Sequence, residues 1–102
     1  MTDYSDHYKP LPKKVTISSS KIHGLGLFAT EEILINAVLG ITHVHEIGFK
    51  DDYIRTPLGG FINHSNTPNC TLFKVGSLYL YLKALKTIPK GEELTVKYSL
   101  HQ

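Results

Sequence analysis

The chain has 102 residues and a mass of 11.4 kDa, enough for one domain with one hydrophobic core. Lysine and arginine number 11 and aspartate and glutamate 9, and a net charge of only +2 argues against nucleic acid as the main partner, because phosphate binding needs several clustered cations. The single cysteine excludes an internal disulfide and a multi-cysteine zinc site within the chain, and no apolar run approaches the ~20 residues of a membrane span.

The N-terminal segment, residues 1–14, carries two prolines and no hydrophobic periodicity, which predicts an extended arm in front of a domain formed by residues 15–102. The arm also lacks the apolar region of a secretory signal, so an intracellular location is expected, in the cytoplasm or in a eukaryotic nucleus. At the start of the domain, Val15 and Ile17 alternate with polar residues, a pattern of period two that predicts a half-buried strand. A glycine-containing turn then leads into a second short strand over Leu27–Ala29.

The middle of the chain predicts one long strand between two less regular segments. Residues 31–37 could form a single helical turn, but Asn36 suits a chain reversal with a positive φ. The apolar residues of Val38–His45 predict a strand. Residues 46–60 contain three glycines, a proline and two aspartates, which predicts mostly loop.

The C-terminal third shows the clearest strand patterns. Leucines and tyrosines alternate over Leu78–Leu82, so the leucines should face one side of a sheet and the tyrosines the other. Ile88–Gly91 has proline second and glycine fourth, as in a β-turn. After this turn Leu94, Val96 and Tyr98 share one strand face, and Tyr98 is expected to point toward the interior. Since no stretch shows a helical apolar stripe, the sequence predicts a mainly β domain of many short strands.

Three segments could carry chemistry, and each also has an ordinary structural explanation. Gly24–Ala29 is a G-x-G followed by an apolar run, whose glycines either let the backbone approach a ligand closely or only form a turn. Gly60–Cys70 runs from apolar residues into small polar ones, as a well-capped surface loop also would. Gly91–Tyr98 is a turn feeding a strand, in which Tyr98 could be a buried tyrosine with a satisfied hydroxyl.

The polar residues of the second segment allow two further interpretations. The side chains of Asn63, Ser65 and Asn69 can cap backbone groups and so hold an irregular loop rigid. A metal site would have to draw on scattered side chains, namely His43, His45, His64 and Cys70. None of them shows C-x-x-C or H-x-x-x-H spacing, so no bound metal is expected.

Taken together and in this order, the three segments resemble the SET domain, the fold of protein lysine methyltransferases. The family's first motif, a G-x-G followed by an apolar residue and often Phe-Ala, is matched by Gly24–Ala29. Its third motif, R-F-I-N-H-S-C-x-P-N, is matched by Phe61–Ser65 and by Pro68-Asn69. Its fourth motif, G-E-E-L-T-x-x-Y, is matched in full by Gly91–Tyr98. The resemblance extends over about residues 15–99.

The resemblance implies a SET-domain fold, mainly β, with several short-stranded sheets. In the family the C-terminal strand threads under the loop of the third motif and forms a pseudoknot, a rare topology that strand patterns alone would not predict. The cofactor S-adenosylmethionine (SAM) lies in the family against the G-x-G backbone and the Asn-His pair. Carried over to this sequence, Gly24, Leu25 and Gly26 would hold its methionine end, and Asn63 and His64 would meet it largely through their backbone.

Two tyrosines complete the site that the resemblance implies. Tyr98 would be the catalytic residue, whose hydroxyl positions a neutral lysine amine and the transferring methyl group together with backbone carbonyls. A further tyrosine usually precedes the third motif and touches the cofactor, and Tyr53 is the only tyrosine in residues 51–60. An exposed loop tyrosine is the alternative interpretation of Tyr53.

The sequence departs from the family pattern at four points. Gly60 replaces the arginine before the third motif, which removes a cation from beside the loop. Asn66 replaces the cysteine that in many members shares a zinc with a cysteine-rich C-terminal flank, so the resemblance also implies no metal here. Val96 stands where many members place Phe or Tyr. Residues 27–59, between the first and third motifs, number only 33, and in the family this stretch helps to form the groove for the substrate peptide.

These expectations leave two classes of function open. The first is a SAM-dependent protein-lysine N-methyltransferase, whose partner is a protein substrate with a target lysine. The alternative is a catalytically inactive SET-fold module that binds or interacts without a lysine channel. A homodimer is expected as well, because a shortened insert leaves apolar surface to bury and the tyrosine face of Leu78–Leu82 suits an interface. Such a second copy would also cover the lysine channel of a methyltransferase. The arm, with Tyr4 and Tyr8, is the other candidate to cover that channel.

Overall fold

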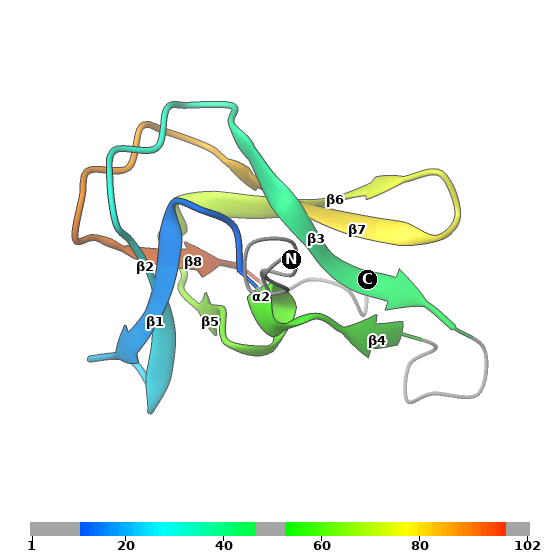
Figure 1. The fold of residues 1–102 in the computed structure, drawn as a ribbon, viewed down its shortest axis with the longest axis horizontal. Coiled ribbons are helices and arrows are strands. Elements are labelled where there is room, and N and C mark those ends of the chain that lie inside the picture. The colour runs from blue at the N-terminus through cyan, green and yellow to red at the C-terminus, as the bar shows by residue number, and fades with distance from the viewer. Residues whose placement is uncertain (1–10, 47–52, 98–102) are drawn as a thin grey trace, which may run out of the picture.

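The computed structural model describes residues 11–46 and 53–97, whose strands form two four-stranded sheets (Figure 1). The first sheet has the strand order β1 (Val15–Ser19), β2 (Leu25–Ala29), β8 (Glu93–Val96) and β5 (Asn63–His64). The second has the order β4 (Tyr53–Arg55), β3 (Val38–His45), β7 (Tyr79–Ala84) and β6 (Cys70–Val75). The described helix, α2 (Pro57–Gly60), has four residues, so no helix in this part of the chain is long enough to cross a membrane. The predicted mainly β fold is confirmed.

The β1–β2 hairpin places the first motif at one corner of the first sheet. The strands are antiparallel and pair from Val15 with Ala29 to Ser19 with Leu25. The backbone N–H of Ser20 donates to the carbonyl of Gly24 at 2.8 Å and closes the turn between them. Strand β2 therefore begins at Leu25, earlier than the predicted Leu27, because the hairpin register extends to the turn.

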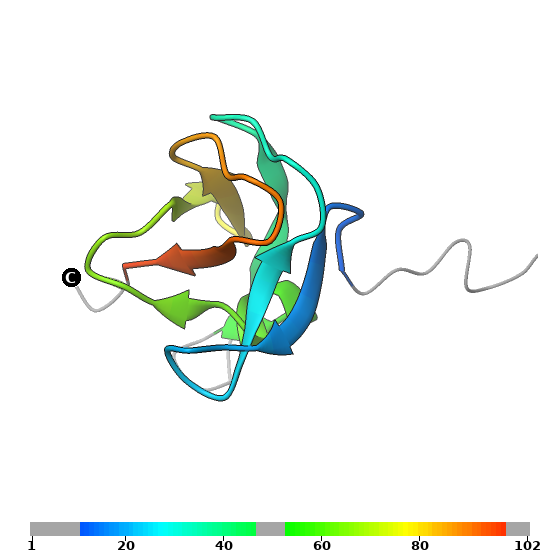
Figure 2. The same cartoon turned by 90° about the vertical axis from the view of Figure 1, so that its left-hand side faces the viewer.

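Strand β8 lies between strands that are far apart in the sequence. It pairs antiparallel with β2, where Leu94 lies opposite Leu27, and parallel with β5, where Thr95 lies opposite Asn63. Figure 2 shows β8 between these two neighbours. Beyond β5, the backbone N–H of Ser65 donates to the carbonyl of Val96 at 2.8 Å, so the loop of the third motif is attached to β8. The C-terminal strand of the described residues thus lies beside the third motif, as the SET-domain resemblance implied.

The second sheet is built around β7, which pairs with β6 over six residue pairs and with β3 on its other side. Leu80 and Leu82 are buried, whereas Tyr79 and Tyr81 on the opposite face are half-buried. This confirms the predicted separation of leucines and tyrosines within β7, which follows from the two-residue period of a strand. Leu78 precedes the strand and is 50% exposed, so the prediction is wrong for that leucine.

Residues 31–37 form a reversal and contain no helix. Ile33 makes an isolated bridge with Ile88, and the backbone N–H of Ile35 donates to the Thr87 hydroxyl at 3.1 Å. Asn36 has φ +71°, as its residue type suggested. Partners from the distant β7–β8 connection satisfy these backbone groups, and no helical turn is needed.

Residues 46–60 were expected to be mostly loop, and this prediction is wrong for the part that the structure describes. Strand β4 pairs with β3, and α2 follows it directly. Thr56 caps the helix by accepting a hydrogen bond from Gly59 N–H at 3.3 Å, and Pro57 occupies the first turn. Leu58 anchors the helix because its side chain is only 2% exposed. A Cβ at Gly59 would overlap the carbonyl of Thr42, so this position requires glycine for close packing on β3.

The turn before β8 is displaced by one residue from its predicted position. The backbone N–H of Glu92 donates to the carbonyl of Pro89 at 3.1 Å, so the hydrogen-bonded turn begins at Pro89. Gly91, with φ +90°, is its third residue, a position where a positive φ favours glycine.

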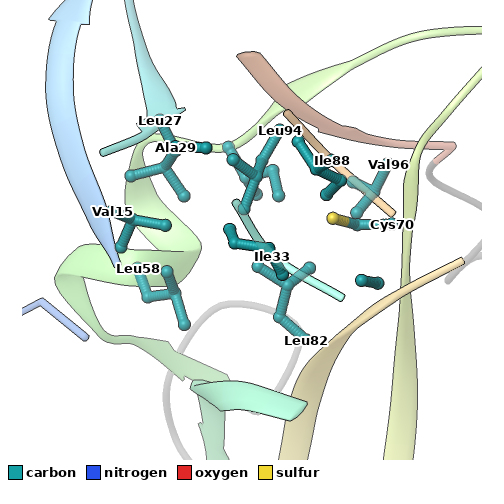
Figure 3. Packing of buried hydrophobic residues seen from close by; sticks show 12 residues of the cluster. Val15, Leu27, Ala29, Ile33, Leu58, Cys70, Leu82, Ile88, Leu94 and Val96 are labelled. Carbon is teal, nitrogen blue, oxygen red and sulfur yellow. The ribbon is translucent and has the colours of Figure 1, made fainter. Parts of the chain in front are cut away.

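The hydrophobic core lies where the two sheets meet (Figure 3). Its completely buried leucine and isoleucine side chains come from both sheets and from their connections: Leu27, Ile33, Leu82, Ile88 and Leu94. Full burial of such a side chain contributes about 1.5–3 kcal/mol to folding. The last residues of the predicted arm also contact this body, since Leu11 packs against the core and the carbonyl of Lys14 accepts from Thr30 N–H at 2.8 Å. Residues 1–10, with Tyr4 and Tyr8, lie outside the described residues.

Candidate active site

The side chain of Asn63 joins the third motif to the first. Asn63 begins β5, and its Nδ2 lies 3.0 Å from the carbonyl oxygen of Leu25 and 3.2 Å from that of His23. Both acceptors belong to the G-x-G turn. The structure therefore brings together the predicted site residues Gly24, Leu25 and Asn63, which are separated by almost forty residues of sequence.

The fourth motif reaches the same point through Glu93, the first residue of β8. Its carboxylate accepts from the Ser20 hydroxyl at 2.8 and 2.9 Å and from Asn63 Nδ2 at 2.9 Å. Ser20 in turn accepts from the backbone N–H groups of Ile22 and His23 at 2.9 and 3.3 Å, which fixes the hairpin turn. We refer to Ser20, Asn63 and Glu93 as the junction cluster, because it connects all three motifs.

Sequence reasoning did not identify Ser20 or Glu93 as site residues. Glu93 belongs to the fourth motif, but the motif does not show which way its side chain points. Ser20 ends a run of serines just before the turn, where a hydroxyl commonly caps the following N–H groups, and this signal could have been noticed. The contact between Ser20 and Glu93 spans 73 residues of sequence and depends on the β1–β2–β8 strand order.

The two glycines of the first motif serve different purposes. Gly24 has φ +44° and open space where a Cβ would be, so its requirement is conformational. Gly26 is buried, and a Cβ there would overlap Glu93 Oε2 and lie 3.0 Å from Asn63 Nδ2. Leu25 between them is 49% exposed, so its side chain is directed to solvent while its carbonyl faces Asn63.

Asn69 holds the loop of the third motif against β8. Its Nδ2 lies 2.9 Å from Glu92 Oε2 and 2.8 Å from the carbonyl of Glu93, and its Oδ1 accepts from Thr95 N–H at 2.8 Å. Together with a 3.0 Å bond from Thr67 N–H to the Ser65 hydroxyl, these contacts confirm the prediction that polar side chains cap this loop.

His64 follows Asn63 in β5, where it pairs in register with Val96. Its ring is exposed and its Nε2 lies 3.4 Å from Asn66 Oδ1. The main chain of His64 is thus held at the β5–β8 pairing, as a residue that meets a cofactor through its backbone requires. Tyr98 lies outside the described residues, two positions beyond the end of β8 at Val96, and its catalytic role stays a prediction.

Tyr53 lies at the start of β4 in the second sheet. Its ring makes edge contacts with His43 and His45, with centroid distances of 5.9 and 5.4 Å. His43 is buried, and burial together with the nearby Arg55 guanidinium lowers the pKa of its imidazole. The ring of Tyr53 thus packs against these two histidines, and its role as a cofactor contact stays a prediction.

The possible metal ligands named from the sequence come from three strands. His43 and His45 are on β3, His64 on β5 and Cys70 on β6. Burial, with the nearby Glu92 carboxylate, raises the pKa of the Cys70 thiol to about 12, which disfavours the thiolate that metals bind. Within residues 11–46 and 53–97, no three side chains of His, Cys, Asp or Glu gather as a metal site. The absence of a metal stays a prediction.

Comparison with known proteins identifies the family. A family model of the SET domain matches residues 49–99, which include the third and fourth motifs. A histone-lysine N-methyltransferase of Aspergillus oryzae, named as specific for H3 lysine 4, is 33% identical to the chain in an alignment that covers 92% of it. The chain belongs to the SET domain family. A relative of the same name from Neurospora crassa is 30% identical with the same coverage.

Solved structures agree with this SET-domain assignment at the level of the fold. A Plasmodium falciparum protein assigned to the histone methyltransferases superposes with a TM-score of 0.69 at 24% identity, covering 88% of this chain and 96% of its own. The methyltransferase domain of human PR domain-containing protein 2 superposes with a TM-score of 0.64 at 20% identity, covering 87% and 79%.

The SET domain described here is small beside its sequence relatives. It spans only about a tenth of their length, 10% for both the Aspergillus oryzae and the Neurospora crassa proteins. The alignment with the Aspergillus oryzae protein extends over 126 positions and covers 92% of the 102 residues, about 94, so the aligned part of the relative carries about 32 additional residues. This difference agrees with the short stretch between the first and third motifs.

Proposed function

We propose that this SET domain is a SAM-dependent protein-lysine N-methyltransferase. The observation that carries the proposal is the Asn63 amide, which joins the G-x-G turn to Glu93 of the fourth motif. The names of the curated relatives, which are histone-lysine methyltransferases, support the same reaction class. An intracellular location, nuclear in a eukaryote, follows from such a function and is part of the proposal.

The residues of the G-x-G turn fit the methionine end of SAM. Asn63 Nδ2 faces several oxygen atoms, and the opposite orientation of the amide would place its own oxygen against them. The Nδ2 side of the amide is therefore directed at these oxygen atoms, which leaves Oδ1 as an acceptor for a cationic amino group. The open space where a Cβ of Gly24 would lie keeps the adjoining backbone accessible. When bound, SAM supplies an electrophilic methyl group on a positively charged sulfur.

Tyr98 would provide the hydroxyl that positions the lysine amine. A lysine has a reference pKa of about 10.4, so it must lose its proton before it can attack. A site that excludes water and places the amine beside a cation lowers the pKa of that amine. The protein would then act mainly by orientation and electrostatics, which suits a tyrosine hydroxyl as a rigid hydrogen-bonding group.

A second candidate function is a SET-fold binding module without catalysis. The shorter aligned length of this chain favours it, because in the family the stretch between the first and third motifs contributes to the peptide groove. The two functions share the cofactor site and differ in whether a lysine can reach it.

The deciding experiment measures binding and transfer separately. Calorimetry with SAM is expected to give a Kd between about 1 µM and 1 mM, roughly −8 to −4 kcal/mol. Methyl-labelled SAM is then offered with free histone H3 and with cell lysate, and labelled lysine is sought by mass spectrometry. Transfer supports the methyltransferase, and binding without transfer supports the module. Failure of both SAM and its demethylated product to bind would contradict the methyltransferase and leave an interaction module without the cofactor.

A further inference from the structure

We infer that Glu93 and Ser20 are positioning residues of this site: they hold the Asn63 amide so that its oxygen accepts a hydrogen bond from the cationic amino group of the ligand. The inference rests on the proposed function, because it assumes an amino-acid-bearing nucleoside such as SAM at the G-x-G turn. It extends that function to two residues that do not touch the ligand themselves.

Hydrogen-bond acceptors surround the side-chain nitrogen of Asn63. Its amide nitrogen carries two hydrogens, and four oxygen atoms lie within 3.2 Å of it: Ser20 Oγ, the carbonyls of His23 and Leu25, and Glu93 Oε2. Three of the four cannot donate a hydrogen bond, and the single hydroxyl hydrogen of Ser20 is directed at the Glu93 carboxylate. An amide oxygen turned toward this cluster would therefore meet only acceptors, so one orientation of Asn63 is enforced.

The charge of Glu93 strengthens Asn63 Oδ1 as an acceptor. The hydrogen-bond partners of its carboxylate among the described residues, Ser20 and Asn63, are both neutral. The carboxylate is partly buried, where electrostatic interactions are stronger than in water. A chain of hydrogen bonds from carboxylate to amide to ligand polarises each member in the same direction, which makes Asn63 Oδ1 a better acceptor for a cation.

The same contacts could serve only the fold, because Ser20 and Glu93 also connect the β1–β2 turn to β8. The two roles predict different effects on ligands. If the contacts serve only the fold, their loss should lower the affinity of every ligand of the site by the same factor. A positioning role would weaken ligands that carry the amino group and leave those without it almost unaffected.

The test uses the full chain and two probes, S-adenosylhomocysteine and its analogue in which a hydrogen replaces the α-amino group. The ratio of their Kd values measures recognition of the amino group. In the parent protein S-adenosylhomocysteine should bind at least tenfold more tightly than the analogue. In Glu93→Gln, which keeps the shape of the side chain and removes its charge, this ratio should fall by about tenfold, or about 1.4 kcal/mol.

Glu92→Gln is the matched control, since Glu92 is exposed and its carboxylate contacts Asn69 and not Asn63. Its ratio should equal that of the parent. Ser20→Ala should lower the ratio as Glu93→Gln does, and it decides the question if thermal unfolding shows that Glu93→Gln does not fold.

Three results would overturn the inference in distinguishable ways. If the parent binds neither probe, the proposed function fails and the inference with it. If the parent binds both probes equally, the site does not recognise the amino group. If the parent discriminates and the ratio is unchanged in the folded variants, the junction cluster serves only the fold.

Discussion

Gly26 faces the carboxylate of Glu93 across the β2–β8 pairing, and a Cβ at residue 26 would overlap Glu93 Oε2. The G-x-G motif would by itself suggest that this glycine makes room for the cofactor. In the folded chain, the space beside Gly26 is already filled by the Glu93 carboxylate of the junction cluster.

Gly26→Ala is therefore expected to lower stability as well as cofactor affinity. The methyl group must displace the end of the Glu93 side chain, at a cost of about 1–3 kcal/mol in the free energy of unfolding. Urea denaturation measures this loss, and calorimetry measures the accompanying loss of SAM binding. Gly60→Ala is the control, because no atom lies within 4 Å of its would-be Cβ, and it should be neutral or more stable by up to about 1 kcal/mol. Equal stability of Gly26→Ala and the parent would contradict the overlap.

Tyr98→Phe should fold as the parent does and lose methyl transfer. Removal of one hydroxyl that positions the amine should slow transfer at least tenfold, which corresponds to about 1.4 kcal/mol of lost transition-state stabilisation. Single-turnover transfer with labelled SAM checks this, and Tyr79→Phe on the outer face of β7 is the matched control with an unchanged rate. A full rate in Tyr98→Phe would reduce this residue to a structural tyrosine.

Asn69→Ala should be among the more damaging single substitutions in the chain. It removes three hydrogen bonds, and it leaves the buried N–H of Thr95 without the Asn69 Oδ1 acceptor. Such a loss costs about 2–4 kcal/mol, which thermal or urea unfolding detects easily. Asn66→Ala, on the exposed side of the same loop, should change stability by less than about 0.5 kcal/mol. Similar effects of the two substitutions would show that Asn69 does not hold the loop to β8.

Cys70 should make stability depend on alkaline pH. Its pKa is raised from 9.0 to about 12 in the folded protein, so above pH 9 the unfolded chain releases the thiol proton while the folded chain retains it. The unfolded state then binds fewer protons, and the free energy of unfolding falls by up to about 1.4 kcal/mol per pH unit between pH 9 and 12.

Cys70→Ala isolates this contribution of the thiol from other groups that titrate at high pH. The variant is expected to be less stable at neutral pH, because it leaves a cavity, but to lose less stability between pH 9 and 10.5. Identical slopes for the two proteins would contradict the raised pKa. In the parent, the thiol should react with iodoacetamide only after denaturation.

The outer face of the β6–β7 hairpin is the place where a second copy is expected to bind. Phe73 and Tyr81 lie 5.7 Å apart between ring centroids, and Tyr79 and Tyr81 lie 6.3 Å apart. Light scattering at micromolar concentration should give twice the chain mass, and Tyr81→Glu should give the monomer mass, because a charge would be buried in the interface. A parent protein that scatters as a monomer would contradict the dimer.

The sequence by itself was sufficient to predict the features that depend on residues close together along the chain. A strand presents alternate residues to opposite faces, so the burial of Leu80 and Leu82 and the outward direction of Tyr79 and Tyr81 could be predicted from five consecutive residues. The chain reversal at Asn36 was predictable for the same reason, because a positive φ is a property of that residue and its own backbone. The three motifs likewise sufficed to recognise the family, which the matching of residues 49–99 confirms.

Only the tertiary structure decided which of these local pieces meet. The short elements β4 and α2 lacked a strong pattern, since what stabilises them is pairing with β3 and the fit of Gly59 against Thr42. The partnership of Ser20 with Glu93 depends on β2 lying beside β8, and that strand order is set by burial of the shared core. Periodicity is a property of a few neighbouring residues, whereas a hydrogen bond across 73 positions exists only once the whole sheet has formed.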